Sequence, residues 1–160
     1  MARTAPPALT GPTALPSGRA WPRLRPGVLG AVLVGGCIGG LARVAVTTAW
    51  PTASGAFPWS TFVVNSSGAF LLAFLLVLLT EILPPTTYVR PLLATGFCGA
   101  FTTFSAITVS SDQLLAHGHA TIGAVYLLGS FVAGLVSAAA GLIAGRALAA
   151  GRRRTAKEVS

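Results

Sequence analysis

Four long apolar stretches constrain this chain more than any other feature of its sequence. They cover residues 28–49, 59–79, 92–115 and 122–149. A helix needs about 20 consecutive, mostly apolar residues to cross the hydrocarbon core of a bilayer, and each stretch meets that length. The sequence therefore predicts an all-α membrane protein with four transmembrane helices.

The composition agrees with this fold class, because 53% of the residues are hydrophobic and 9% are charged. Soluble domains carry roughly a quarter charged residues. Residues 27–150 are expected to form the membrane domain, flanked by two basic tails, 1–26 and 151–160. The first tail is rich in proline and cannot bury a core, so we expect it to be disordered. No soluble domain of independent size remains, and we expect the protein to act inside the bilayer.

The net charge of +8 is concentrated on one side of the predicted spans. Every basic residue except Arg43 lies in the tails, at the end of the last span, or at Arg90 between the second and third spans. The connections on the other side, 50–58 and 116–121, contain none. The positive-inside rule then predicts a plasma-membrane protein with both termini in the cytoplasm. Basic clusters beside apolar spans are topology signals or contacts to membrane lipid, which disfavours nucleic acid as a partner.

One segment of the third stretch departs from plain helix. Residues 96–105 read Gly-Phe-Cys-Gly-Ala-Phe-Thr-Thr-Phe-Ser, with no charge nearby. Hydrocarbon contains no water to satisfy loose backbone groups, so irregular backbone persists at that depth where it lines a cavity or binds something. The sequence therefore predicts a third helix that is broken in mid-membrane, at an ion or solute site.

The polar groups near this segment are neutral. Asn65 offers an amide in the second span, and Thr102, Thr103, Ser105 and Thr108 offer hydroxyls in the third. A desolvated anion needs donors, which hydroxyls, amides and the positive edges of phenyl rings supply. Unwound backbone instead presents carbonyl oxygens, which suit a cation. The same segment could therefore hold a structural cation and line the path of an anion.

Several of these residues have a simpler interpretation. Phe97, Phe101 and Phe104 are spaced as a packing stripe on one helix face, and spacing alone favours that interpretation. Hydroxyl side chains in membranes often bond to their own helix. Arg43 in the first span is either a snorkelling anchor or part of an electropositive vestibule. Asn65 is harder to explain by packing, since a buried amide needs partners.

The sequence does not favour an enzyme. Glu81 and Asp112 are predicted at opposite faces of the membrane, so they cannot form an acid–base pair. His117 and His119 lie in a short loop without a supporting catalytic or metal-binding motif. We interpret the two histidines as exposed loop residues and leave the role of Asp112 open.

Three motifs occur in a defined order along the chain. They are Gly35-Gly36-x-x-Gly39-x-x-x-Arg43, Thr61-x-x-x-Asn65-x-x-Gly68 and Gly96-Phe97-x-Gly99-x-x-Thr102-Thr103-Phe104-Ser105. With the four spans they cover residues 28–148, and together they resemble the Fluc/CrcB family of small fluoride channels. The resemblance implies an antiparallel, dual-topology dimer that exports fluoride passively.

The resemblance also implies roles for individual residues. The backbone carbonyls of Gly99 and Thr102 would bind a structural sodium ion at the dimer interface. The fluoride path would be lined by side chains of the second and third spans, with contributions from the fourth. These side chains are Asn65, Phe104, Ser105 and Thr108, with Tyr126 and Ser130 from the fourth span.

The sequence departs from the family pattern at one pore position. The family continues Phe-Ser-x-Phe-Ser, whereas this chain reads Phe104-Ser105-Ala106-Ile107-Thr108. Ile107 lacks the positive ring edge of phenylalanine, so an aromatic anion site at this position should be impaired. An antiparallel homodimer must also insert one sequence in both orientations, which the one-sided charge forbids. We therefore expect a heterodimer with a homologous subunit of opposite orientation, a homodimer being the alternative.

Two other functions compete with a fluoride channel. A small multidrug-type exporter is also a four-span dimer, but such proteins usually need a membrane-embedded acid, and the first span has none. A non-conducting assembly subunit would need only the packing glycines. Thr102→Val or Phe104→Ile should not abolish the function of a pure scaffold.

Overall fold

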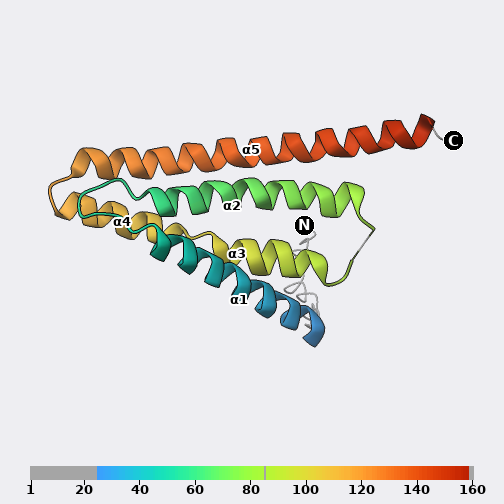
Figure 1. Cartoon of the computed structure of the whole chain (residues 1–160), viewed down its shortest axis with the longest axis horizontal. Helices are drawn as coiled ribbons and strands as arrows, with labels where there is room; N and C mark the ends of the chain where they lie inside the picture. The colour runs from blue at the N-terminus through green and yellow to red at the C-terminus, as the bar shows by residue number, and fades with distance from the viewer. Residues whose placement is uncertain (1–24, 85, 159–160) are drawn as a thin grey trace, which may run out of the picture.

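The computed structural model describes residues 25–84 and 86–158, and the regular structure in this part of the chain is helical throughout (Figure 1). Side chains are described as far as residue 152. The segment predicted to be disordered, 1–26, lies outside the described residues except for its last two. Four helical segments are long and apolar enough to cross a membrane, which confirms the predicted fold class.

Each predicted span corresponds to one or more helices. The first span is α1 (Pro26–Ala49), and the second is α2 (Trp59–Val77) followed by η1 (Leu78–Ile82). The third span consists of η2 (Pro91–Cys98), α3 (Gly99–Phe101) and α4 (Phe104–Ala116). The fourth span is α5 (Ala120–Glu158). The segments η1 and η2 are π-helical, a wider helix whose hydrogen bonds reach back five residues. The third span is broken between α3 and α4, as the sequence predicts.

Prolines delimit several of these helices. Pro26 occupies the first turn of α1, where its missing N–H leaves no helical hydrogen bond unmade. Pro51 follows the end of α1, Pro58 precedes the start of α2 and Pro84 follows η1. Because proline cannot continue a helix, the spans end sharply and the connections between them stay short.

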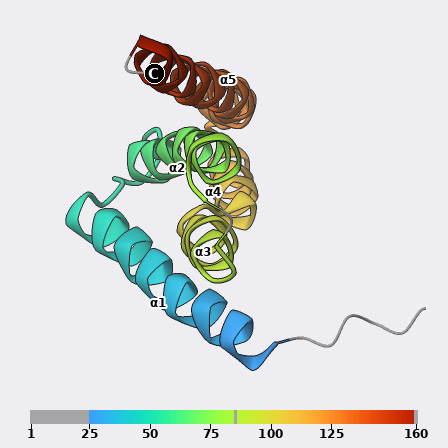
Figure 2. The ribbon, with the colours of Figure 1, turned by 90° about the vertical axis from the view of Figure 1, so that its right-hand side faces the viewer.

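The helices pack as layers. α2 and α4 lie along α5, while α1 crosses η2 and α3 on the other side (Figure 1). Figure 2 shows α1 and α5 on opposite sides of the middle layer formed by the second and third spans. The start of α1, the connection from η1 to η2 and the end of α5 share one end of the molecule. The connections α1–α2 and α4–α5 share the other end, called here the loop end.

Two glycines allow α1 to approach the third span closely. Gly35 and Gly39 are the buried residues of α1. A Cβ at Gly35 would clash with the carbonyl oxygen of Leu92, and a Cβ at Gly39 would clash with that of Phe97. Backbone-to-backbone contact of this kind is the usual way in which membrane helices gain packing energy, since lipid is as apolar as leucine.

Glycines also join α5 to α2. A Cβ at Gly141 would clash with the carbonyl oxygen of Phe70, and one at Gly145 would lie 2.8 Å from the Cβ of Val77. α5 has 39 residues, which at 1.5 Å per residue make about 58 Å, roughly twice the hydrocarbon core. It continues as helix into the basic segment 151–158 and projects beyond the other helices in Figure 1.

We expect Gly39→Ala to lower the stability of the protein in detergent by about 1–3 kcal/mol, the usual penalty for overpacking. The new methyl group would meet the backbone of Phe97, which cannot rotate aside as a side chain can. Gly40→Ala is the matched control, because nothing lies within 4 Å of that Cβ position. Thermal unfolding followed by tryptophan fluorescence measures both variants. Equal melting temperatures for the two would contradict the packing of α1 on η2.

Candidate functional site

The break in the third span is two residues long. α3 ends at Phe101 and α4 begins at Phe104. Between them, Thr102 (φ −83°, ψ 154°) and Thr103 (φ −153°, ψ 115°) are extended. Extended residues turn backbone groups away from the helix axis, so the helical hydrogen bonds cannot continue across this point.

The side chain of Asn65 in α2 holds the break in place. Its Oδ1 accepts a hydrogen bond of 2.7 Å from the backbone N–H of Thr103. Its Nδ2 donates to the backbone carbonyl of Thr61, one turn earlier in α2, at 3.0 Å. The amide is therefore fixed at both ends, and it supplies the partner that a backbone N–H away from water requires.

The side chain of Thr103 caps the helix that follows. Its Oγ1 accepts from the backbone N–H of Ala106 at 3.3 Å and lies 3.1 Å from the hydroxyl of Ser105. A hydroxyl at this position satisfies one of the free N–H groups of the first helical turn. α4 can therefore restart in mid-span without leaving the N–H of Ala106 unpaired.

These two side-chain hydrogen bonds deprive two carbonyls of their helical donors. In a continuous helix, the carbonyl of Gly99 would accept from Thr103 and that of Thr102 from Ala106. Both N–H groups are instead bonded to the side chains of Asn65 and Thr103. Gly99 is also exposed, with nothing within 4 Å of the position of an added Cβ. The break thus releases the two carbonyls that the sequence resemblance assigns to sodium.

A groove of about 510 Å³ lies beside the break, between α2, the third span and α5. Six residues named from the sequence contribute to its lining: Asn65, Thr102, Thr103, Phe104, Ile107 and Ser130. None of its lining residues in the described part of the chain carries a formal charge. The groove can therefore offer an ion neutral donors and the edges of aromatic rings.

Two residues predicted for the same path, Ser105 and Thr108, do not line this groove. Both are exposed on α4, and the Thr108 hydroxyl donates to the carbonyl of Ser105 at 2.9 Å. A hydroxyl that donates to its own helix has no second proton for an anion. The role of Ser105 and Thr108 in the ion path stays a prediction.

The three phenylalanines of the third span divide into two groups. Phe97 and Phe101 stack with their ring centroids 5.5 Å apart and their planes 13° apart, as a packing stripe would. Phe104 instead lies beyond the break and is 69% exposed. The interpretation of all three as one stripe is therefore wrong for Phe104, because two extended residues interrupt the helical spacing on which it rested.

Tyr126 and Ser130 of α5 are buried, with 0% and 5% of their surface exposed. The Tyr126 hydroxyl lies near the hydroxyls of Thr61, Ser110 and Ser130. Within the described residues, however, neither Tyr126 nor Ser130 makes a side-chain hydrogen bond of ordinary length and angle. Buried hydroxyls are normally paired. In this cluster between α2, α4 and α5, the hydroxyls of Tyr126 and Ser130 are therefore not committed to well-formed hydrogen bonds.

The charged residues of the spans lie apart from the groove. Arg43 is half-buried and lines a smaller pocket of about 210 Å³ with Thr61 and Thr103. Whether Arg43 is a vestibule residue or an anchor stays a prediction. Glu81 lies in η1 and Asp112 in α4, at opposite ends of the molecule as predicted.

Two residues of the site were not singled out from the sequence. Thr103 was grouped with the other hydroxyls, although threonine just before a helix is a standard capping signal. Phe131, which is 65% exposed, lines the groove from α5. Its position next to Ser130 was the available signal, since an aromatic ring beside a polar residue within a span is unusual for plain lipid contact.

These features define a small multi-pass membrane protein whose third span is broken at a site of free carbonyls and neutral donors. The chain belongs to the CrcB-like family (Camphor Resistance, CrcB), whose pattern it matches over residues 30–142.

The chain is also similar to proteins named fluoride-specific ion channels. It is 54% identical over 134 residues to FluC 3 of Streptomyces avermitilis. The aligned region is 84% of this chain and 66% of that protein, just under two thirds of its length. It is 45% identical to FluC 1 of Mycolicibacterium paratuberculosis, over 68% of this chain and 83% of that one. FluC 2 of Streptomyces avermitilis is 43% identical, over 62% and 63% of the two chains.

Asn65→Ala should destabilise the protein by about 1–3 kcal/mol, because it leaves the N–H of Thr103 without its acceptor away from water. Ser67→Ala is the matched control on the same helix, since the Ser67 hydroxyl bonds to its own helix at the carbonyl of Val63. Thermal unfolding measures the loss, and hydrogen exchange of the Thr103 amide locates it. Unchanged protection of that amide in Asn65→Ala would contradict the role assigned to Asn65.

Proposed function

We propose that this chain is one subunit of a fluoride-selective ion channel that lowers cytoplasmic fluoride by passive export. The observation that carries the proposal is the broken third span, which frees backbone carbonyls beside an uncharged, mostly apolar groove with a few neutral polar groups. Membership of the CrcB-like family and the names of the relatives support it. A passive channel needs no catalytic group, and the direction of net flux follows the gradient.

The groove supplies the anion path in this proposal. Phe104 presents an exposed ring at its wall, and the edge of a phenyl ring is positive. The Asn65 amide keeps one N–H after bonding to Thr61. Ser130 lines the groove, and its buried hydroxyl makes no hydrogen bond of ordinary geometry within the described residues. Conduction requires binding that replaces hydration yet lets the ion leave. Neutral donors meet both demands better than a fixed buried cation would.

Ile107 weakens this path at one step. It lines the groove and is 8% exposed, so it occupies a wall position without a ring edge to offer. In a dimer with two pores, one pore can be non-conducting if the partner subunit supplies the residues that line the other pore. Ile107 therefore fits a chain that works beside a different subunit.

A structural sodium ion at the centre of the dimer is the second part of the proposal. The carbonyls of Gly99 and Thr102 lack their helical donors, and carbonyl oxygens are hard ligands that suit such a cation. Two carbonyls cannot complete a coordination shell. The exposed position of Gly99 leaves room for a second subunit to supply the remaining ligands.

The partner is proposed to be a homologous subunit inserted in the opposite orientation. The cytoplasmic end of this chain, with both termini, carries its basic residues apart from Arg43, so the chain inserts one way. An antiparallel partner must then have the reverse charge bias. Two relatives, FluC 2 and FluC 3, come from one organism, which supports paired subunits. The basic helix ends would also contact anionic membrane lipid.

The competing functions have no supporting feature of their own. Glu81 and Asp112 lie near the ends of their spans, where neither could serve as the central acid of a multidrug-type exporter. A non-conducting assembly subunit would not need Asn65 to hold open a break in mid-span.

Fluoride efflux from loaded liposomes tests the channel and its pairing together. We expect little efflux from this chain alone and robust efflux when it is co-reconstituted with the oppositely oriented homologue. In the pair, Phe104→Ile should reduce efflux by about tenfold, the effect of losing about 1.4 kcal/mol of ion stabilisation. Phe70→Ile is the control, since Phe70 does not line the groove.

The outcomes separate the parts of the proposal. Robust efflux from this chain alone would refute an obligate heterodimer but keep the channel. No efflux from either preparation would refute the channel itself. Equal efflux from Phe104→Ile and Phe70→Ile would remove Phe104 from the path.

The thermal stability of the assembled dimer should depend on sodium. A ligand at a hundred times its Kd stabilises the folded form by about 2.7 kcal/mol, so the melting temperature should rise in sodium chloride relative to choline chloride at equal ionic strength. Asn65→Ala should weaken this dependence, because the N–H of Thr103 then loses the acceptor that holds the break, and with it the two carbonyls, in place. The same melting temperature in both salts for the unmodified pair would rule out the sodium site.

A further inference from the structure

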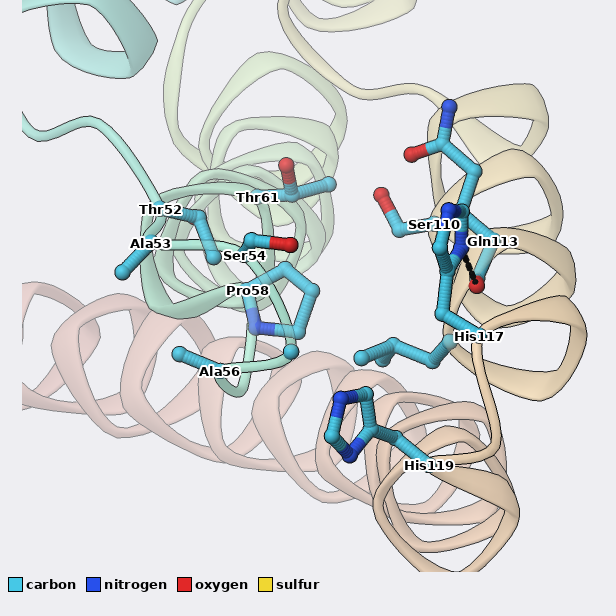
Figure 3. A pocket seen from close by; sticks show the side chains of 12 residues that line it. Thr52, Ala53, Ser54, Ala56, Pro58, Thr61, Ser110, Gln113, His117 and His119 are labelled. Atoms are coloured by element: carbon cyan, nitrogen blue, oxygen red, sulfur yellow. Dashed lines mark hydrogen bonds between the residues drawn. The ribbon is translucent and has the colours of Figure 1, made fainter.

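A second hollow, of about 380 Å³, lies at the loop end of the molecule (Figure 3), and neither residue of the break, Thr102 or Thr103, lines it. Its walls are the connection 50–58, the start of α2, the last turns of α4 and the α4–α5 turn. We call it the loop-end pocket. Its polar lining residues are Thr52, Ser54, Thr61, Ser110, Gln113, His117 and His119.

The two histidines are the titratable residues of this pocket. Within the described lining, the connection 50–58 and the start of α2 contribute hydroxyls and small residues but no charged side chain. Asp112 lies on α4 but does not line the pocket. Since imidazole is the side chain whose charge changes between about pH 5 and 8, the net charge of the pocket follows His117 and His119.

The hydrogen bond of His117 decides what this residue presents to the pocket. Its Nδ1 lies 2.7 Å from the backbone carbonyl of Gln113 (Figure 3). A carbonyl oxygen only accepts, so Nδ1 must carry the proton, and Nε2 is the free nitrogen. In neutral His117 the free nitrogen is an acceptor, which repels an anion. Protonation turns it into a charged donor, which attracts one.

His119 connects the two loops that frame the pocket. Its ring edge rests on Gly55, where an added Cβ would lie 2.5 Å from Nε2 of His119. Gly55 has a positive φ of 74°, which glycine adopts readily. The ring is exposed but rests against the 50–58 connection, which places its charge at the pocket wall when it is protonated.

The floor of the pocket continues into the buried hydroxyls. Thr61 and Ser110 line the pocket and also lie near the hydroxyl of Tyr126, next to Ser130. Ser130 in turn lines the groove beside the break. The hydroxyls of Thr61, Ser110, Tyr126 and Ser130 thus lie between the loop-end pocket and the groove. Tyr126 and Ser130, both more than nine-tenths buried, make no side-chain hydrogen bond of ordinary length and angle within the described residues.

We propose that the loop-end pocket is a binding site for a small inorganic anion, which His117 and His119 hold when their imidazoles are protonated. The site feeds the series of hydroxyls below it. Each protonated ring at about 6 Å from the anion raises its local concentration about threefold, even with the screening of bulk water. The binding step depends on this pocket alone, while its effect on flux rests on the proposed channel function.

Nuclear magnetic resonance tests the binding step without any flux. The chain contains two histidines, so a preparation without a histidine tag gives two imidazole signals, which His117→Gln and His119→Gln assign. The signals are titrated from pH 5 to 8 in sodium fluoride and in sodium gluconate at equal ionic strength. Anion binding to the protonated form should raise the titration midpoints in fluoride, by about one pH unit at ten times the Kd.

Asp112→Asn is the matched control for this titration, because Asp112 is on α4 outside the pocket. It should keep the difference between the two salts. Identical midpoints in fluoride and gluconate would overturn the anion site. If the midpoint of each histidine still differs between fluoride and gluconate after the other histidine is replaced by glutamine, two separately contributing rings are supported. If both single variants lose the difference, one anion shared by the two rings is supported.

Fluoride efflux from the assembled pair measures the consequence for transport. Unmodified protein should conduct several-fold faster at pH 6 than at pH 7.5 after subtraction of the leak of protein-free liposomes. The double variant His117→Gln/His119→Gln should lose this ratio, so that its efflux is similar at the two pH values. An unchanged ratio in the double variant would overturn the role of the pocket in transport. Fluoride-dependent midpoints without any efflux would instead show that the anion site stands and the channel proposal fails.

Discussion

The hydrogen bond from the N–H of Thr103 to Oδ1 of Asn65 is the interaction on which the rest of the structure depends. An unpaired backbone N–H in hydrocarbon costs several kcal/mol, so without this acceptor the break at Thr102 and Thr103 would carry that cost. One amide side chain from α2 thereby keeps two residues of the third span extended, and it releases a carbonyl that a closed helix would consume.

The break requires its surroundings to be rigid, because a loose bundle would let Asn65 drift away from Thr103. Close packing of α1 on η2 through Gly35 and Gly39 supplies that rigidity on one side. Gly141 and Gly145 supply it on the other, between α5 and α2. Membrane helices gain little from burial away from lipid, so close backbone contact must provide the packing energy. The glycines of this chain therefore help to hold the break in the third span, although they lie outside it.

The sequence predicted the four spans, the broken third span and the involvement of Asn65, because apolar length and neutral polar groups in a span are local signals. It did not predict which N–H Asn65 accepts from, since that bond joins residues 38 positions apart. It also grouped Phe104 with Phe97 and Phe101, because helical spacing assumes a helix that the two extended residues interrupt. Local patterns indicate that a break exists, whereas tertiary contacts decide where it falls and which rings it separates.

In the proposed orientation, the one-sided charge of this chain sets the face of the membrane on which the loop-end pocket lies. In an antiparallel pair, the loop ends of the two subunits face opposite sides of the membrane. Two identical chains would place His117 and His119 on both sides, so protonation would favour entry and exit equally. A chain that inserts one way carries its histidines on one face. In the proposed orientation, with the termini in the cytoplasm, that face is external. The proposed anion site would then respond to external acidity, while the cytoplasmic entrance would depend on the partner.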